Sequence, residues 1–412
     1  MTSTRWLVYP AMVAVMVLSV TAGAGARAIA APAKASVTLN VASWSAAAQE
    51  ENAVKKLLAA FTSKYHINTK YQVLNGDYPT AMKARITAGS APDVFYLNSD
   101  VAQDFIQTGQ IHNLDFLKKS KSYGYKELYP SLLKGFAWKG HQYAIPKDYS
   151  TLALWYNKTM FQAAGISKPP TTWSQFKTDA CKLTNKSKKV YGAVVSADPA
   201  RWLAFVYAAG GSLFNKNRTK VTIDNAGAKA ALDFYAGLVK DGCAAIPSTV
   251  GAGWNGEAFG KELGAMVFEG NWLTQPMQQT YPNVKWGVTV LPKGPKTSGN
   301  LAFTASWAMY AKTKQFKAAS QLMEFLTGKT GMTQWDKDSG YLPARKNVKV
   351  APGGAVFVKQ VKYSKDWFFP PHFSTALTPI GNDIQKVMQG QLSSSDALKD
   401  MQAQGNQALN AP

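Results

Sequence analysis

Acidic and aromatic side chains follow the ends of predicted strands, where together they could hold a polyhydroxylated molecule. Asp148 comes just after the apolar strand end Tyr143-Ala144-Ile145, and Asp100 comes three residues after the strand Phe95-Tyr96-Leu97. Trp44 follows the first predicted strand. Carboxylates form charge-assisted hydrogen bonds with hydroxyl groups, and aromatic rings cover the C–H faces of a saturated ring. Because ligands of α/β folds bind at the carboxyl ends of strands, these positions favour a binding site.

The sequence lacks the common motifs of zinc enzymes, serine hydrolases and phosphate-binding loops. The four histidines lack the spacing of zinc ligands, and no G-x-S-x-G motif occurs. Gly328-Lys329-Thr330 resembles the end of a phosphate-binding loop, but Met323 stands where that motif needs glycine, so a helix C-cap is simpler. The sequence therefore predicts no catalytic residue, no cofactor and no metal. A glycosidase pair formed by Asp100 and Asp148 is the enzymatic alternative.

The strong positive charge of the chain is not accompanied by nucleic-acid-binding features. The 412 residues are 46% apolar, which fits a soluble protein of two ordinary domains, each with its own core. The 46 basic and 24 acidic residues give a net charge of +22. The lysines are dispersed, the densest group being Lys182 to Lys189, and no basic helix occurs. We therefore expect no nucleic-acid partner, and the shortage of carboxylates suggests an acidic medium or an anionic envelope surface.

The first 35 residues are predicted to be a secretory signal peptide. Arg5 precedes the apolar run from Trp6 to Val20, and small residues in the A-x-A pattern follow. An uncleaved membrane anchor is the alternative, although the apolar run is short for a membrane span. The expected location is therefore the periplasm or the extracellular cell surface.

The chain has two cysteines, Cys181 and Cys243. Export would permit a disulfide between them, since oxidising compartments preserve such bonds. Both are expected on or beside helices of the same domain. Two separate buried thiols are the alternative, so the sequence leaves the pairing open.

Hydrophobic periodicity predicts alternating strands and helices in the first third of the mature chain. Apolar residues alternate with polar ones at 37–41, and they recur at helical spacing at 54–61. Further strands are expected at 71–73, 93–97 and 286–292, and further helices from Pro79, from Thr172, at 224–242 and near Ser395. Such alternation is typical of α/β architecture with a largely parallel sheet.

Several segments, in this order along the chain, carry a family resemblance. They are Gly89-Ser90-Ala91-Pro92-Asp93-Val94, the stretch 140–158, the stretch 221–230, Gly270-Asn271-Trp272, Gly287-Val288-Thr289-Val290-Leu291-Pro292 and Gly340-Tyr341-Leu342-Pro343-Ala344-Arg345. Together they resemble bacterial extracellular solute-binding proteins, the sugar-capturing subunits of ABC importers, and among these the maltose/maltodextrin-binding proteins. The resemblance covers roughly residues 36 to 410.

The resemblance implies a two-lobe, periplasmic-binding-protein-like (Venus-flytrap) α/β fold with mixed, mostly parallel sheets and a multi-strand hinge. One lobe should comprise residues 36–149 and 306–350, and the other residues 152–301 and 353–412. The implied function is capture of a maltose-like or other oligosaccharide between the lobes and its delivery to an ABC transporter permease. A monomer is expected. The alternatives are the same fold with a cationic or other non-sugar solute and, less favoured, a glycoside-processing enzyme.

The resemblance and the residue types together give a set of candidate ligand-binding residues. They are Trp44, Ser45, Asn98, Asp100, Asp148, Tyr149, Trp202, Trp254, Trp272, Trp307 and Tyr341. Several have a competing structural role: Asp100 as a helix N-cap, Asp148 in a surface salt bridge, and the tryptophans in the cores. Leu97 stands where the maltose-binding relatives have tryptophan, so the same disaccharide geometry does not follow.

Overall fold

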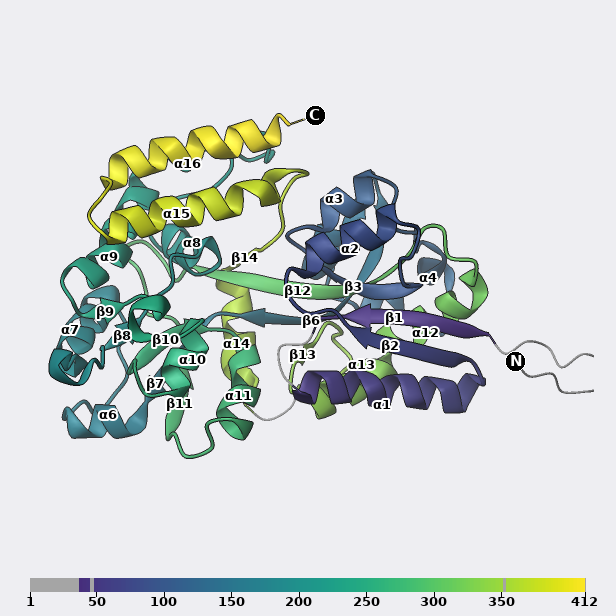
Figure 1. The fold of residues 1–412 in the computed structure, drawn as a ribbon, viewed down its shortest axis with the longest axis horizontal. Coiled ribbons are helices and arrows are strands. Elements are labelled where there is room, and N and C mark those ends of the chain that lie inside the picture. Colours follow the sequence, from purple (N-terminus) through teal and green to yellow (C-terminus); the bar gives the residue numbers. More distant parts are fainter. Residues whose placement is uncertain (1–36, 45–47, 351–352, 412) are drawn as a thin grey trace, which may run out of the picture. The chain divides into compact units, whose positions relative to one another are not determined.

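The computed structural model describes residues 37–44, 48–350 and 353–411. The signal peptide predicted for residues 1–35 lies outside these ranges, as does Ser45. The described chain is an α/β structure with two mixed sheets (Figure 1). The predicted fold class is confirmed at this level.

The first sheet carries most of the N-terminal strands. Its strands are β1 (Thr38–Ser43), β2 (Asn68–Val73), β3 (Val94–Asn98), β6 (Ala144–Thr151), β12 (Asn300–Met309), β13 (Leu342–Pro343) and β14 (Ser364–Asp366). Their order is β13-β6-β12-β3-β1-β2, with β14 paired to β12. Since β1 lies parallel to both β2 and β3, the carboxyl ends of these three strands meet at one edge of the sheet.

The second sheet has the order β11-β7-β10-β8-β9. Its strands are β7 (Ala153–Asn157), β8 (Ala193–Val194), β9 (Ala244–Ala245), β10 (Met266–Glu269) and β11 (Trp286–Thr289), and a separate hairpin joins β4 (Ala137–Trp138) to β5 (His141–Gln142). Apart from that hairpin, every antiparallel ladder between named strands of the described chain involves β6, β7 or β12. The mixture of directions therefore arises from the strands near the passage between the sheets.

Three segments meet where the chain passes from the first sheet to the second. β6 ends at Thr151 and β7 begins at Ala153, so Leu152 is the crossing residue. The Asn300 side chain accepts a hydrogen bond from the Leu152 N–H at 3.1 Å and donates to the Leu152 carbonyl at 2.8 Å. Gln360 donates to the same carbonyl at 2.7 Å and accepts from the Asn300 amide at 2.9 Å. Buried backbone groups at the crossing are thus satisfied by side chains from two other segments.

Helices cover both sheets. They are α1 (Ala48–Tyr65), α2 (Tyr78–Thr87), α3 (Ala102–Gln107), α4 (Phe116–Lys119), α5 (Pro130–Leu133), α6 (Lys158–Ala163), α7 (Trp173–Leu183), α8 (Pro199–Ala208), α9 (Ala226–Lys240), α10 (Asn255–Gly260), α11 (Thr274–Gln279), α12 (Phe316–Thr327), α13 (Lys329–Ser339), α14 (Ala355–Gln360), α15 (Leu377–Met388) and α16 (Ser394–Leu409). α1 packs against α13, whereas α15 and α16 lie against α9 (Figure 1). Within the described residues, none of these helices combines the length and the apolar composition of a membrane span.

The predicted helix starts agree with the observed caps. Thr172 accepts a hydrogen bond from the Gln175 N–H at 3.3 Å and begins α7. Asn225 caps α9 in the same way, and Gly242 follows that helix with a φ of 70°. Ser393, a neighbour of the residue expected from the sequence, caps α16. These short polar side chains satisfy amide groups that the first helical turn leaves without partners.

Cys181 and Cys243 form a disulfide that joins the end of α7 to the segment before β9. The alternative of two separate thiols is therefore wrong. The bond closes a loop of 62 residues, for which the chain-entropy relation gives a stabilisation of roughly 4 kcal/mol.

We expect the double variant Cys181→Ser/Cys243→Ser to lose about 4 kcal/mol of the free energy of unfolding in urea titrations. Reduced wild-type protein should match the double variant, and equal stability of all three samples would contradict this role.

Candidate ligand-binding site

A cavity of about 240 Å³ is lined by residues of the first sheet and of nearby segments, including the turn that follows β10 of the second sheet. The lining residues are Trp44, Glu50, Asn98, Ser99, Asp100, Lys147, Asp148, Tyr149, Ser150, Asn271, Trp272, Phe303, Thr304, Ala305, Tyr341 and Trp367. Trp44 and Asn98 enter it from the carboxyl ends of β1 and β3, as the sequence suggested. The cavity thus lies at the strand edge where α/β folds bind ligands.

Four consecutive residues of β6, Lys147 to Ser150, line this cavity, and a β-bulge explains why the side chains of Lys147 and Asp148 both reach it. Asp148 pairs with Ala305 of β12 and Pro146 pairs with Ser306, so Lys147 is an extra residue in the ladder. Successive side chains of a regular strand point to opposite faces, and a bulge interrupts that alternation. The lysine and the aspartate therefore both reach the cavity.

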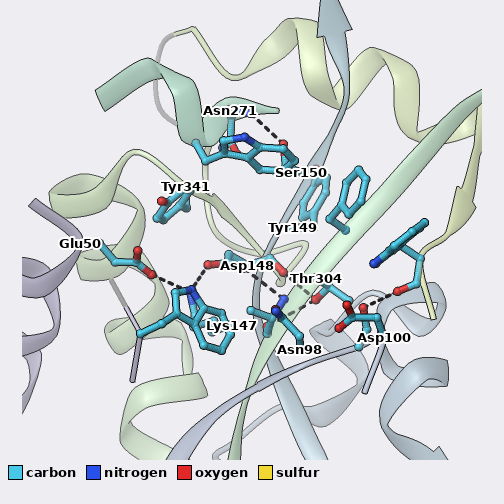
Figure 2. Close-up of a pocket in the computed structure, with 16 residues that line it drawn as sticks. Glu50, Asn98, Asp100, Lys147, Asp148, Tyr149, Ser150, Asn271, Thr304 and Tyr341 are labelled. Carbon is cyan, nitrogen blue, oxygen red and sulfur yellow. Dashed lines mark hydrogen bonds and ion pairs between the residues drawn. The ribbon is translucent and has the colours of Figure 1, made fainter. Parts of the chain in front are cut away.

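Three buried charged groups form one side of the cavity. The Lys147 ammonium is ion-paired with the Asp148 carboxylate, and its Nζ lies 3.7 Å from Oε1 of Glu50 in α1 (Figure 2). The other Asp148 oxygen, Oδ1, accepts a hydrogen bond from the Ala305 N–H at 3.4 Å. All three charged side chains are buried. Asp148 therefore does not form the surface salt bridge that the sequence left open.

The Trp272 indole is held in place by a buried ion pair. Trp272 lies in the 3-10 turn Asn271–Leu273 directly after β10, and its Nε1 donates to Oε2 of Glu269 at 2.7 Å. The Arg201 guanidinium makes two contacts with that carboxylate, at 2.7 and 3.2 Å, and lies 5.4 Å from the indole ring centre. Burial disfavours the charged guanidinium, but the Glu269 and Asp198 charges outweigh it and raise the pKa of Arg201. The aromatic plane at the cavity is thus fixed by the carboxylate of this ion pair.

Two buried side-chain oxygens of the cavity residues accept no hydrogen bond within the described chain. They are Oδ1 of Asp100 and Oδ1 of Asn271. The Asn271 backbone N–H donates to the Ser150 hydroxyl at 2.9 Å, which holds the residue in place (Figure 2). Because buried polar atoms are nearly always hydrogen-bonded, such oxygens suit a ligand that brings its own donors. Hydroxyl groups are donors of this kind.

Burial raises the pKa of Asp100 to about 6, against the opposing effect of hydrogen bonds from the Trp367 side chain and the backbone. A carboxyl group whose pKa is raised on folding costs stability once it ionises, so stability falls as the pH rises from about 4 to 6. We expect Asp100→Asn to raise the free energy of unfolding at pH 7.5 by up to about 3 kcal/mol and to change it little at pH 4. Urea unfolding at both pH values measures this, and an equal effect at both would contradict it.

Seven of the eleven candidate residues line the cavity: Trp44, Asn98, Asp100, Asp148, Tyr149, Trp272 and Tyr341. Ser45 lies outside the described residues, and the remaining three candidates do not line the cavity. Trp202 is fully buried on the inner face of α8. Trp307 is buried against Tyr96, with 4.4 Å between the centres of the two rings. Trp254 precedes α10 and is 37% exposed away from the cavity. The prediction that these three tryptophans bind the ligand is therefore not supported: Trp202 and Trp307 are core residues, and Trp254 is a surface residue.

Other lining residues were not among the candidates. Lys147, Ser150 and Asn271 are immediate neighbours of candidate residues, so adjacency was the available signal. Phe303 to Ala305 and Trp367 come from crossing segments, and Glu50 comes from the first turn of α1. Nothing in the local sequence distinguishes that glutamate from an ordinary exposed residue at the start of a helix.

Other cavities of the described chain have a different lining. One of about 370 Å³ shares Trp44 and Asn98 with the first cavity and is otherwise largely apolar. Two larger ones, of about 550 and 820 Å³, have no acidic residue among their described lining residues. Clusters of three or more potential metal ligands are not found in the described ranges. Among these cavities of the described chain, the first combines fixed aromatic planes with several carboxylates.

Two curated relatives are binding proteins. A binding protein of Brucella abortus (strain 2308) is 27% identical over 268 residues, which cover 63% of this chain and 64% of that protein. The alignment thus spans slightly less than two thirds of the relative. The galactooligosaccharide-binding protein of Bacillus subtilis (strain 168) is 22% identical over 371 residues, which cover 85% of each chain.

Solved structures share the fold over nearly the whole chain. An ABC substrate-binding protein of Listeria monocytogenes in complex with cycloalternan has a TM-score of 0.83 at 21% identity, covering 92% of this chain and 100% of that one. The maltose-bound MalE3 of T. maritima has a TM-score of 0.78 at 19% identity, covering 90% and 99%. These likenesses confirm the predicted two-lobe fold.

Residues 56–365, about three quarters of the chain, match the family model described as bacterial extracellular solute-binding protein. This match agrees with the order of motifs in the sequence and with the fold. The chain belongs to the bacterial extracellular solute-binding proteins.

Proposed function

We propose that this protein is an exported binding protein that captures a neutral oligosaccharide in the 240 Å³ cavity and delivers it to an ABC transporter permease. The observation that carries the proposal is the pairing of a fixed indole, Trp272, with the carboxylates of Asp100 and Asp148 in one cavity. Aromatic faces and charge-assisted hydrogen bonds are the two contacts that a sugar ring needs. The protein acts as a monomer and binds without chemical conversion of the sugar.

The proposed motion is closure of two lobes, one of residues 36–149 and 306–350 and the other of residues 152–301 and 353–412. The hydrogen-bonded meeting of Leu152, Asn300 and Gln360 supports a hinge at the crossing. A ligand that contacts both lobes favours the closed state by its differential affinity for that state.

A neutral ligand is favoured over a cationic one because most carboxylates at the cavity already have cationic partners. Lys147 lies between Glu50 and Asp148, and Arg201 pairs with Glu269 behind the indole. An incoming cation would have to compete with these buried partners. Hydroxyl donors can instead use the remaining acceptor positions of the same oxygens.

A ligand of more than one ring is favoured by the adjoining cavity of about 370 Å³. Trp44 and Asn98 line both cavities, so a chain of sugar rings could pass from one to the other along them. The second cavity is lined by Tyr78 and Phe105, whose apolar faces suit a further ring. The Bacillus subtilis relative is itself named for an oligosaccharide.

A thermal-shift screen tests this function. Neutral mono-, di- and trisaccharides should be compared with cationic solutes such as putrescine and spermidine. A ligand present at 100 times its Kd stabilises the folded state by about 2.7 kcal/mol, so a bound sugar must raise the Tm. We expect neutral di- or trisaccharides to give the largest shift. A shift with the cations and none with any sugar would support the cationic alternative, and release of shorter sugars on incubation would show an enzyme.

A further inference from the structure

We propose that Lys147 fills an ammonium-binding cage built into the cavity wall, so that the site accepts a neutral ligand where it would otherwise bind a cation. This inference deepens the proposed function, because it names the residue that excludes cationic ligands. It assigns to the cage a chemical class of occupant, a primary ammonium group. In the native protein that occupant is the lysine itself.

The cage consists of aromatic rings around the Lys147 ammonium. Nζ lies 4.2 Å from the ring centre of Trp335, 4.3 Å from that of Tyr96 and 5.4 Å from that of Tyr341. Ring faces within about 6 Å attract a cation through their quadrupole, and aromatic cages recognise ligand ammonium groups in this way. Three such rings surround one lysine that is only 3% exposed.

The cage is closed by two carboxylates. Asp148 forms an ion pair with Lys147, and Oε1 of Glu50 lies 3.7 Å from Nζ. The Tyr341 hydroxyl forms a hydrogen bond with Glu50, and burial together with the Glu50 and Asp148 charges raises the pKa of that tyrosine well above its usual value. The hydroxyl therefore stays protonated and donates to the carboxylate. Rings and acids thus surround one positive charge on several sides.

The backbone places the lysine there by an exception to the strand pattern. Lys147 is the extra residue of the β6 bulge, between Pro146 and Asp148. A regular strand would direct the side chain of residue 147 away from that of residue 148. The bulge brings both to one cavity, as required if the ammonium is to offset the neighbouring carboxylate.

The ammonium also positions the ligand-facing carboxylate. Asp148 Oδ2 is ion-paired with Lys147 and Oδ1 accepts from the Ala305 N–H. Without the lysine, Glu50 and Asp148 would be buried acids that lack this common partner, and the empty cage would offer an external ammonium the same surroundings. Loss of Lys147 should therefore weaken sugar binding and create affinity for a small ammonium ion.

Chemical rescue tests the inference. Lys147→Ala is titrated with propylammonium chloride and, as a neutral isostere, with 1-propanol, while Tm is followed at constant ionic strength. We expect propylammonium to raise the Tm of Lys147→Ala by several degrees more than that of wild-type protein, and 1-propanol to give no such difference. The matched control is Lys118→Ala. Lys118 is also paired with a carboxylate, Asp115 at 2.6 Å, and lies over the Tyr125 ring at 6.0 Å, but it does not line the cavity.

A second pair of variants covers the case in which Lys147→Ala does not fold. Lys147→Met retains the apolar stem and should bind the best sugar of the screen at least tenfold more weakly, whereas Lys147→Arg should stay within threefold of wild type. Equal responses of wild type, Lys147→Ala and Lys118→Ala to propylammonium, or unchanged sugar affinity of Lys147→Met, would overturn the inference. The rescue does not depend on any sugar, so its failure is distinguishable from failure of the proposed function.

Discussion

Replacing Trp272 by alanine is expected to weaken sugar binding about a hundredfold, or nearly 3 kcal/mol, while the protein stays folded. The indole packs against both hydrophobic cores but remains partly exposed at the cavity. Its Nε1 is fixed by Glu269 at 2.7 Å, so its ring face is presented in one orientation. A preorganised aromatic face loses little entropy on binding, which makes it a typical hot spot.

Isothermal titration calorimetry with the best sugar of the thermal-shift screen measures this effect. Trp254→Ala is the matched control, because Trp254 is 37% exposed and does not line the cavity. We expect Trp254→Ala to bind like wild type. Affinity of Trp272→Ala within threefold of wild type would remove the indole from the proposed site.

Arg201→Leu is expected to cost roughly 3–5 kcal/mol of folding free energy. Glu269 is fully buried, and its carboxylate contacts Arg201 through two hydrogen bonds. Removing the guanidinium leaves that charge in a low-dielectric environment without its main cationic partner, and desolvation of the carboxylate is then uncompensated. Urea unfolding of the variant and of wild-type protein measures the difference.

The double variant Arg201→Leu/Glu269→Leu separates stability from ligand positioning. Replacing both members of a buried ion pair by apolar residues is often nearly neutral, so most of the lost stability should return. Sugar binding should remain weak, because the Trp272 N–H has lost its acceptor. A double variant with wild-type affinity would show that the ion pair does not orient the indole, and one as unstable as Arg201→Leu would contradict the charge argument.

The N-terminal strands and helices could be predicted because each has one buried face. Val54, Leu57 and Phe61 recur at helical spacing and are buried in α1. Asp77 caps α2, and Pro79 lies in the first turn of that helix. Proline is common there because the N–H that it lacks would have no partner within the helix. The antiparallel return of β12 beside β6 could not be predicted in this way, since the two strands are about 150 residues apart in sequence and no local pattern records their direction.

Site residues that follow the ends of strands could be predicted from the sequence. Residues whose position depends on tertiary packing could not. Trp44 and Asp148 follow from strand ends and motifs, and both line the cavity. Trp202 is a tryptophan like Trp44 but lies in the core. It belongs to α8, a mostly apolar helix whose residues are mostly buried. Lys147 was missed because period-two alternation assigns it to the opposite face from Asp148, and only the bulge in the pairing with β12 reverses that assignment.

The Asp100 carboxyl group and the overall composition both favour stability in an acidic medium. Asp100 favours folding at acidic pH, since burial raises the pKa of its carboxyl group to about 6. The shortage of acids in the whole chain, 24 against 46 basic residues, acts in the same direction by leaving few carboxylates to protonate. Stability that falls steeply from neutral pH to about pH 4 would contradict acid adaptation.

The most direct measurement is a crystal structure of the protein grown with the sugar that raises its Tm most. We expect one sugar ring in contact with the face of Trp272, with its hydroxyl groups within hydrogen-bond distance of Asp148 and Asp100. Electron density for the sugar only in one of the larger cavities, such as that between Tyr156 and Pro169, would contradict it.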